Sequence, residues 1–230
     1  MIPARYGSER LKLKNLALLD GKPLIYYAIK SAKLSNMFEK IYINSDNLLF
    51  KKIAKRYKVD FYLRPKHLGS SETRSDEVVE DFMKFNPQAK NVAWINSIDP
   101  FQTKDNIKHI LKYYFSKNLD SLITTEKKQV HGMYANKPIN FKKNKLFEKT
   151  QNLKEIELFT YSLMIWKSKT FLKEFKKNGN AFFCGKFSTF EIKKNYGVII
   201  KNINDIKFAN LIIKLKKNFK LKYDKISKIK

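Results

Sequence analysis

The most chemically equipped part of the sequence is its first fifteen residues. Cationic side chains, a hydroxyl and a flexible glycine follow a very short apolar start, at Arg5, Gly7, Ser8, Arg10 and Lys14. Such residues, placed between a strand and a helix, are the equipment of a phosphate-binding loop. The segment lacks the glycine-lysine-serine/threonine ending of a Walker loop, and its single glycine does not make a dinucleotide-binding fingerprint. The residues therefore indicate a phosphate site of neither common class.

Arginine is informative because lysine is the default cation of this chain. Arginine occurs only at Arg5, Arg10, Arg56, Arg64 and Arg74, and four of the five fall in two short segments that we expect to be loops. A guanidinium offers a planar fork of donors that matches a phosphate or a carboxylate, whereas a lysine ammonium is a point charge. This distribution indicates a geometric requirement in anion recognition, with ordinary surface ion pairs as the alternative.

The overall charge favours small anions over nucleic acid as partners. Lysine and arginine number 48 against 21 acidic residues, a net charge of +27 in 230 residues. The lysines are spread along the whole chain, so we do not expect specific nucleic-acid binding. A basic nucleic-acid-binding module remains an alternative, and it would need a basic stripe on one face. The anions we expect are nucleotide phosphates and a sugar carboxylate, which a positive field attracts.

Composition also bounds the class of protein. No apolar run approaches the roughly 20 residues that span a bilayer, and the first residues do not form an apolar signal core. We therefore expect no membrane association and a cytoplasmic location. The single cysteine, Cys184, stands among phenylalanines, which indicates a buried structural thiol. The length and the hydrophobic content of 43% fit a single domain with its own core.

The hydrophobic pattern predicts an α/β fold. Apolar runs rich in β-branched residues alternate with stretches of helical period, which is typical of a mainly parallel, Rossmann-like sheet between layers of helices. The expected strands are 40–44, 59–63, 92–95, 121–124, 163–166 and 197–200. Pro23 suits a first helical turn, and Leu48 opens the apolar stripe of a second helix. Ser75, Thr103 and Asn202 are expected to cap three further helices.

Two stretches depart from this alternation. Residues 127–158 separate two expected strands by far more than a typical loop, so we expect an inserted arm within a single domain covering 1–230. At the other end, only Met1 and Ile2 remain of the apolar strand that should lead into the first loop. Either this strand is unusually short or Met1 is not the true start.

An ordered string of motifs resembles the acylneuraminate cytidylyltransferase family, which includes the CMP-sialic acid synthetases. These motifs are Ile2-Pro-Ala-Arg-x-Gly-Ser8, Leu11-x-x-Lys14-Asn15, Gly21-Lys-Pro-Leu-Ile25, Asn44-Ser-Asp46, Leu63-Arg-Pro65, the polar string 70–75, and Asn202-Ile-Asn-Asp-Ile-Lys-Phe-Ala209. The first motif is also similar to the Kdo cytidylyltransferases, and the pair Lys14-Asn15 favours the sialic-acid branch. The resemblance is dense over the first third of the chain and thin elsewhere.

The resemblance implies a nucleotidyltransferase fold whose inserted arm forms a homodimer. It implies an enzyme that activates a sialic-acid-like nonulosonic acid with CTP and releases pyrophosphate, with Mg²⁺ or Mn²⁺ as cofactor. Arg5 and Lys14 would be catalytic. The residues it implies for nucleotide binding are Arg5, Gly7, Ser8, Arg10, Lys14, Asn15, Arg64, Ser75 and Asn96.

The chain departs from the family pattern at three places. The family's Gln-Pro-Thr-Ser-Pro-Leu-Arg becomes 96–102, where Asp99 is either a metal ligand or a turn residue before a proline. Ile199 and Lys201 replace the family's metal-binding aspartate pair, and Thr160-Tyr161 replaces its sugar-side Asn-Gly. A Kdo-type enzyme and a degenerate homologue that binds a nucleotide without turnover therefore remain as alternatives.

Overall fold

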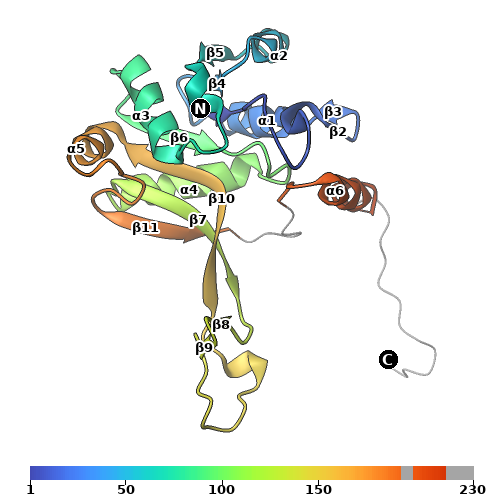
Figure 1. Cartoon of the computed structure of the whole chain (residues 1–230), viewed down its shortest axis with the longest axis vertical. Coiled ribbons are helices and arrows are strands. Elements are labelled where there is room, and N and C mark those ends of the chain that lie inside the picture. Colours follow the sequence, from blue (N-terminus) through green and yellow to red (C-terminus); the bar gives the residue numbers. More distant parts are fainter. Residues whose placement is uncertain (193–198, 216–230) are drawn as a thin grey trace.

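The computed structural model describes residues 1–192 and 199–215, and within them the chain forms a three-layer α/β fold (Figure 1). The central sheet of this part of the chain has the strand order β5-β4-β1-β6-β10-β7-β11. Its strands are β1 (Ile2–Pro3), β4 (Tyr42–Ser45), β5 (Asp60–Leu63), β6 (Asn91–Ile95), β7 (Ser121–Lys128), β10 (Ile156–Lys167) and β11 (Phe187–Glu191). The α/β prediction is confirmed.

The short strand β1 connects the two halves of this sheet. It pairs in parallel with β4 on one side. On the other side the Ile95 amide donates to the Met1 carbonyl at 3.0 Å, and the Met1 nitrogen donates to the Ala93 carbonyl, which is the pattern of a parallel pair with β6. All strands run parallel except β10, which is antiparallel to both β6 and β7. The sheet is therefore mainly parallel, as predicted, and the expected strand at 163–166 is the exception.

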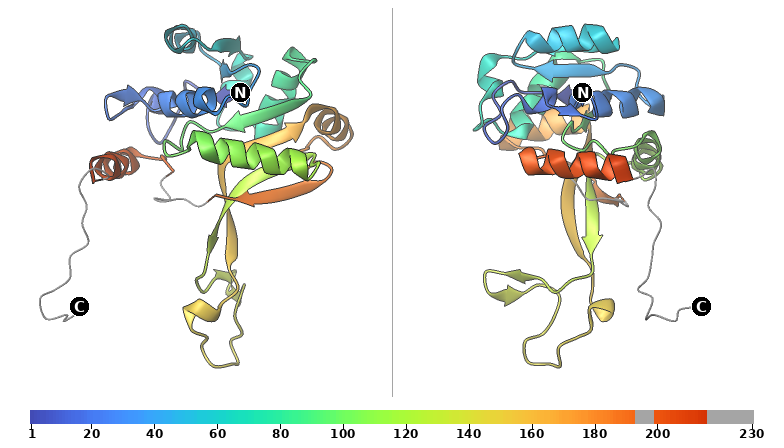
Figure 2. Two further views of the ribbon diagram at one scale, coloured as in Figure 1. Left: turned by 180° about the vertical axis from the view of Figure 1, so that it is seen from behind. Right: turned by 90° about the vertical axis from the view of Figure 1, so that its right-hand side faces the viewer.

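Helices cover both faces of the sheet (Figures 1 and 2). Three of them, α1 (Ile25–Ser35), α2 (Leu49–Tyr57) and α4 (Lys104–Ser116), share one core with the sheet, and α3 (Ser75–Phe85) and α5 (Ser168–Asn178) share the other. Successive side chains of strand β10 enter the two cores in turn, because side chains alternate between the two faces of a strand. Leu163 and Ile165 enter the first core, while Met164 and Trp166 enter the second.

A third, smaller core lies beside the first loop. Helix α6 (Ile203–Leu215) packs on the hairpin of β2 (Leu18–Leu19) and β3 (Lys22–Pro23), and Ile200 is buried between them. Asp20 and Gly21 at the hairpin tip have φ values of 48° and 72°, the left-handed conformations that a tight Asp-Gly hairpin turn requires. The packing of α6 thus places its amino end next to the loop that follows β1.

The predicted caps are correct for two helices. Thr103 accepts a hydrogen bond from the Asn106 amide at 3.1 Å, and Asn202 accepts one from the Asn204 amide at 2.8 Å. The prediction for Ser75 is wrong by one residue, because the backbone amide of Arg74 donates to the Glu77 carboxylate at 2.9 Å and makes Arg74 the cap.

Two other predictions about helix starts are wrong. Pro23 lies in β3 rather than in a first helical turn, because the hairpin uses this residue and α1 begins at Ile25. Leu48 precedes α2 and is 59% exposed, since the buried side of that helix begins at Phe50. The expected strand 197–200 has its first two residues outside the described part, and Ile199 and Ile200 are not in a strand.

Residues 127–158 extend away from the sheet as an arm (Figure 1). The outer ends of β7 and β10 pair at its base, from Phe159 with Thr125 to Ile156 with Lys128. Beyond them lie the two-stranded ribbon of β8 (Met133–Tyr134) and β9 (Lys137–Pro138) and the 3-10 turn η3 (Thr150–Asn152). Leu146 is 94% exposed and Phe147 77% exposed in this monomer. The arm is thus a continuation of two core strands that carries large exposed apolar side chains.

Candidate functional site

The loops that follow β1, β4, β5 and β6 meet at one edge of the sheet, because parallel strands place their carboxyl ends on the same side. In open α/β sheets this is where ligands bind. The edge collects most of the cations and amides predicted from sequence, on the loop after Pro3, on the 3-10 turn η1 (Lys14–Leu16), at Arg64 and on the loop after Ile95. We take this edge as the candidate site.

Arg64 is a buried cation at the end of β5, only 4% exposed. Its Nη2 lies 3.7 Å from Oδ1 of Asp46, and its Nη1 donates to the Asn44 side chain at 3.5 Å. Its Nε is buried and has no hydrogen-bond partner among the described residues. A buried, partly unsatisfied guanidinium is costly unless an anion completes its contacts.

Asp46 connects this arginine to the first loop. Its Oδ1 also accepts a hydrogen bond from the Tyr6 amide at 3.0 Å. The turn η2 (Lys66–Gly69) closes over the same carboxylate, so that a Cβ on Gly69 would lie 2.6 Å from it. A side chain at position 69 would therefore force Asp46 to shift. The protein already surrounds Asp46 and pairs its charge with Arg64.

The cations of the first loop lie close enough to repel one another. Burial lowers the pKa of Lys14, and the guanidiniums of Arg10 and Arg5 lower it further, against a smaller opposing effect of Asp205. Burial also lowers the pKa of Arg64, where the attraction of Asp46 opposes it and the charge of Arg5 adds to it. Arg5, Arg10, Lys14 and Arg64, which we call the cation cluster, thus form a positive surface that an anion would relieve.

Asn15 fastens the first loop to the loop after β6. It is buried, its Nδ2 donates to the Arg5 carbonyl at 3.4 Å, and its Oδ1 accepts from the Ser97 hydroxyl at 2.5 Å. Leu13, two residues earlier, has a φ of 50° and turns the chain into η1. Both ends of the Asn15 side-chain amide therefore bond to the protein, and these bonds fix the loop that carries Arg5 and Lys14.

The other predicted nucleotide-binding residues are less constrained. Gly7 is exposed, and a Cβ added to it would have no heavy atom within 4 Å. The Ser8 amide donates to the Tyr6 carbonyl at 3.1 Å, and Arg10 is exposed. Ser75 is the first residue of α3 and is half-buried. The loop from Tyr6 to Arg10 therefore offers its groups to solvent or to a ligand.

The loop after β6 closes on itself and on β10. Asn96 is held by its backbone amide, which donates to the Ser162 carbonyl at 3.0 Å, and its side-chain oxygen accepts from the Ile98 amide at 3.4 Å. Asp99 is 2% exposed; its Oδ2 accepts from the Ser162 hydroxyl at 2.5 Å, and its Oδ1 accepts from the Phe101 amide at 3.2 Å. Both Asp99 oxygens thus have protein donors, an arrangement that fits the turn alternative.

The donor set of the described residues does not fit a carboxylate-bound metal ion. No group of three or more His, Cys, Asp or Glu side chains in this part of the chain could hold one. Besides Asp46 and Asp99, the first loop carries the exposed Glu9. Beside it lies Asp205, whose Oδ2 accepts from the amides of Lys201 and Asn202 at 2.7 and 2.9 Å. Ile199 is half-buried and Lys201 is exposed where the aspartate pair was expected.

Sequence reasoning missed a set of hydroxyls in the middle of β10, where its pairing with β7 is interrupted. Ser162 joins Asp99 to Gln102, whose Nε2 donates to the serine oxygen at 2.9 Å. Thr160 donates to the Thr124 carbonyl at 3.0 Å. The available signal was the hydroxyl-bearing run Thr160-Tyr-Ser162 that leads into an apolar stretch.

Tyr161 lies in this run, where the register of β10 against β7 shifts. It has a φ of 52°, the left-handed conformation that favours glycine. It occupies the position where the family pattern has its glycine. Tyr161 therefore adopts a backbone conformation that its side chain disfavours.

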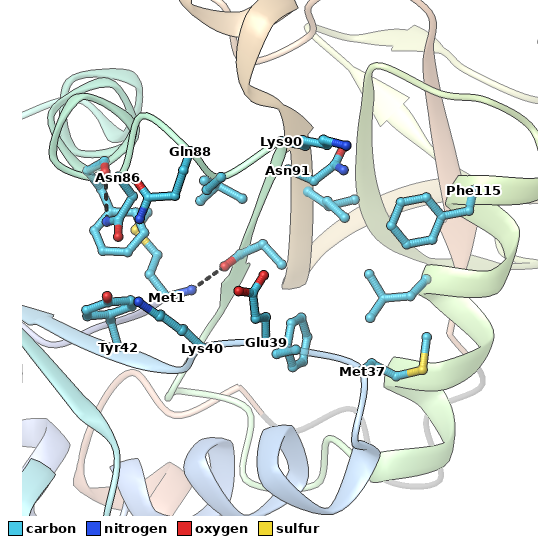
Figure 3. Close-up of a pocket in the computed structure, with 17 residues that line it drawn as sticks. Met1, Met37, Glu39, Lys40, Tyr42, Asn86, Gln88, Lys90, Asn91 and Phe115 are labelled. Carbon is cyan, nitrogen blue, oxygen red and sulfur yellow. Dashed lines mark hydrogen bonds between the residues drawn. The ribbon is translucent and has the colours of Figure 1, made fainter.

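A cavity of about 450 Å³ lies at the opposite edge of the sheet, so it is separate from the candidate site. It opens beside the amino ends of β4 and β6 and is lined by Met1, Glu39, Lys40, Tyr42 and Asn91 among others (Figure 3). None of the predicted phosphate-binding residues lines it. The loops at the carboxyl edge therefore remain the candidate site.

None of the described helices is both long and apolar enough to cross a membrane. Cys184 is fully buried, as predicted, and burial raises the pKa of its thiol to about 12. The pKa supports a structural role, because the thiolate is the reactive form.

Comparison with known proteins agrees with this geometry. The chain is 34% identical over 114 residues to the N-acylneuraminate cytidylyltransferase of Escherichia coli, a match that covers 50% of this chain and 27% of that protein. It is 26% identical over 226 residues to the pseudaminic acid cytidylyltransferase of Campylobacter jejuni, covering 94% and 95% of the two chains. The matches to the first of these relatives and to its streptococcal counterparts thus span about a third of those proteins or less.

A solved structure shares the fold. The CMP:2-keto-3-deoxy-manno-octonic acid synthetase complexed with CTP superposes with a TM-score of 0.71 at 13% identity, covering 94% of this chain and 97% of that one. A family model described as cytidylyltransferase matches residues 1–229. With its loop of cations at the carboxyl edge of a mainly parallel sheet, the chain belongs to the cytidylyltransferase family, as a divergent member similar to the acylneuraminate enzymes.

Proposed function

We propose that the protein is a CTP-dependent cytidylyltransferase that activates a sialic-acid-like nonulosonic acid, giving a CMP-sugar and pyrophosphate. The observation that carries this proposal is the cation cluster on the loops at the carboxyl edge of the sheet, with a buried guanidinium nitrogen that lacks a partner among the described residues. Membership of the cytidylyltransferase family supports the choice of CTP. Two sugar-acid cytidylyltransferases among the relatives support the second substrate.

The proposed reaction exchanges one phosphorus–oxygen bond for another. A hydroxyl oxygen of the sugar acid bonds to the α-phosphorus of CTP, and the bond from that phosphorus to the α,β-bridging oxygen breaks. Pyrophosphate leaves with the bonding electrons, and the hydroxyl proton passes to solvent. Negative charge grows on the leaving phosphates, so fixed cations around them lower the barrier. Arg5 and Lys14 are proposed to act in this way.

The remaining predicted residues take supporting roles in the proposal. Gly7, Ser8 and Arg10 shape the part of the loop that faces the ligand, and Asn15 positions it. Arg64 offers its free Nε to a phosphate. Asn96 and Ser75 are proposed to contact the nucleotide. Asn96 would do so through its side-chain nitrogen, because its side-chain oxygen accepts from the Ile98 amide.

We also propose that two copies of the chain associate through the arm at 127–158 and that 1–230 acts as one domain. Leu146, Phe147 and Tyr134 are large apolar side chains exposed on the arm of the monomer, and burial of such side chains drives association. The proposed location is the cytoplasm, where CTP is made.

Two specific observations favour a second candidate, a protein that binds the nucleotide without turnover. Ile199 and Lys201 stand where the aspartate pair was expected, and Asp99 has protein donors on both oxygens. Loss of catalytic ligands with retention of the binding loop is the pattern of such a protein. If the protein is an active enzyme, the alternative substrate is Kdo.

The decisive experiment incubates the purified chain with CTP, Mg²⁺ or Mn²⁺ and a panel of nonulosonic acids and Kdo, and measures released pyrophosphate. Release with a nonulosonic acid is expected, and release with Kdo alone would move the protein to the alternative. CTP that raises the melting temperature without any release would support the binding protein. Absence of both effects would overturn the choice of CTP.

Two arginine variants test whether turnover and CTP binding depend on the first loop. Arg5→Ala should abolish turnover and the CTP-induced rise in melting temperature. Arg56→Ala removes the same side chain from the exposed side of α2 and should leave both unchanged. Equal losses in the two variants would mean that general charge, rather than the loop, attracts the nucleotide.

A further inference from the structure

We propose that the triphosphate is held by the protein's own cation cluster, so that CTP binds without a carboxylate-bound divalent metal ion. This inference rests on the proposed function, because it takes CTP as the ligand. It goes beyond that function in naming what neutralises the phosphates.

The cation cluster lacks enough internal partners. Of its four members, Arg64 is paired with Asp46, Arg10 is exposed, and Arg5 and Lys14 are half-buried. Charges of the same sign in partly buried positions interact through a lower effective dielectric than water. Burial lowers the pKa of both Lys14 and Arg64, and the charge of Arg5 adds to that lowering in each case. The buried Nε of Arg64 has no hydrogen-bond partner among the described residues.

Of the four carboxylates on or beside these loops, Glu9 is exposed on the first loop, and the other three are already engaged by the protein. Asp46 receives the Tyr6 amide and the Arg64 guanidinium. Asp99 receives the Ser162 hydroxyl and the Phe101 amide, at 2% exposure. Asp205 receives two backbone amides at the start of α6. A hard divalent ion needs several oxygen ligands at once, and each of these three carboxylates already has part of its accepting capacity used by protein donors.

Residues 199–202, which lead into α6, contribute no metal ligand from the two positions where aspartates were expected. Ile200 is buried, and its amide donates to the Ile98 carbonyl at 2.9 Å, so this segment lies against the loop after β6. Its neighbours are Ile199, which cannot bind a metal, and Lys201, which brings a positive charge instead of a negative one. The electrostatic effect of Asp205 on Lys14 shows that the start of α6 is close to the first loop.

The charges at this site are the reverse of those in a triphosphate site that binds its metal ion through carboxylates. Acidic residues that recruit a cation are replaced by side chains that are themselves cations. A guanidinium fork binds phosphate oxygens directly and in two places, which supplies orientation as well as charge. Binding that depends on such contacts weakens with salt and does not need a metal.

The test measures CTP affinity by titration calorimetry, once in EDTA and once in excess Mg²⁺. Dissociation constants within about threefold of each other are expected. Binding at least tenfold tighter in Mg²⁺ would overturn this inference and leave the proposed function standing, whereas no binding in either buffer would overturn both.

Two variants of the same loop make the test specific. Lys14→Met keeps the apolar stem and removes the charge, and it should weaken CTP binding in EDTA by about tenfold, since each factor of ten is about 1.4 kcal/mol. Lys12→Ala removes an equal charge from an exposed position two residues away and should change it less than twofold. Equal effects of the two would overturn the inference, because they would show a diffuse field and not a built contact.

Discussion

Asn15 and Ser97, 82 residues apart in the chain, are joined by a hydrogen bond of 2.5 Å between their buried side chains. This bond connects the loop after β1 to the loop after β6. The side-chain nitrogen of Asn15 also donates a hydrogen bond to the Arg5 carbonyl. The position of Arg5 therefore depends on Ser97 through Asn15. The conformation of the first loop thus depends partly on a segment that is distant in the sequence.

Removal of either partner should weaken both stability and CTP binding. Asn15→Ala leaves the buried Ser97 hydroxyl without its acceptor, which we expect to lower the free energy of unfolding by about 1–3 kcal/mol. Urea denaturation measures this, and calorimetry measures the CTP affinity. Ser97→Ala should cost a similar amount, and the double variant less than the two together. Additive losses would show that the two side chains do not act as a pair.

Ser162→Ala should be among the most destabilising hydroxyl deletions in the chain. It removes the donor to buried Asp99 and the acceptor for Gln102 in one change. We expect a loss of about 2–3 kcal/mol in urea denaturation, because a buried carboxylate is left short of a partner. The matched control is Ser116→Ala on α4, where an exposed hydroxyl contacts the Tyr113 carbonyl, with an expected change within about 0.5 kcal/mol. Similar losses at both serines would contradict this reading.

Tyr161→Gly should stabilise the protein. Its φ of 52° costs a non-glycine residue about 1 kcal/mol, and the side chain is 43% exposed, so little burial is lost. Phe159→Gly, on the same strand and 41% exposed, is the control and should destabilise, because no left-handed φ is relieved there. Thermal unfolding of the two variants decides; a fall in melting temperature for both would show that the Tyr161 ring contributes more than the strain removes.

Asp120 should make stability depend on pH in the acid range. The Lys186 amide at 3.0 Å and the Thr170 hydroxyl at 2.8 Å hold its pKa below the ordinary value, with Lys167 adding to them. Its folded pKa lies below its unfolded pKa, so this stabilisation is present above the unfolded value, near pH 4, and is lost as the pH falls through the folded one. Asp120→Asn should be less stable at neutral pH and lose less between about pH 5 and 3.

Urea denaturation across that range measures the slope. Thr170→Ala removes one of the donors and should give an intermediate profile. An Asp120→Asn variant with the same pH dependence as the unchanged protein would contradict the assignment.

The sequence predicted best where burial follows a simple period. The stripes that define α3 and α4 are buried as expected, at Val79 and Phe82 in one and Ile107 and Ile110 in the other. The direction of β10 was not predictable, because an apolar run such as 163–166 reads alike in a parallel and an antiparallel strand. The edge strand β11 was missed because its residues are only partly buried and give no clear alternation.

The candidate site divides in the same way. The cations of the first loop were predictable because residue type alone suggests phosphate binding. Their supports were not, since the contacts of Asn15 with Ser97 and of Asp99 with Ser162 join segments 82 and 63 residues apart. A sequence shows that a polar residue is present, but the fold decides whether it faces a ligand or holds another loop.

Strand β1 contributes only Ile2 and Pro3 to the ladder with β4, yet it is what connects the two halves of the sheet. The proposed ligand would touch Arg64 from one half and the loop after β6 from the other. A triphosphate lying across this narrow bridge would act as a clamp. The amide hydrogen of Ile2 and those of the neighbouring strands β4 and β6 should then exchange more slowly in the presence of CTP, which would make the phosphates a structural element of the sheet they sit on.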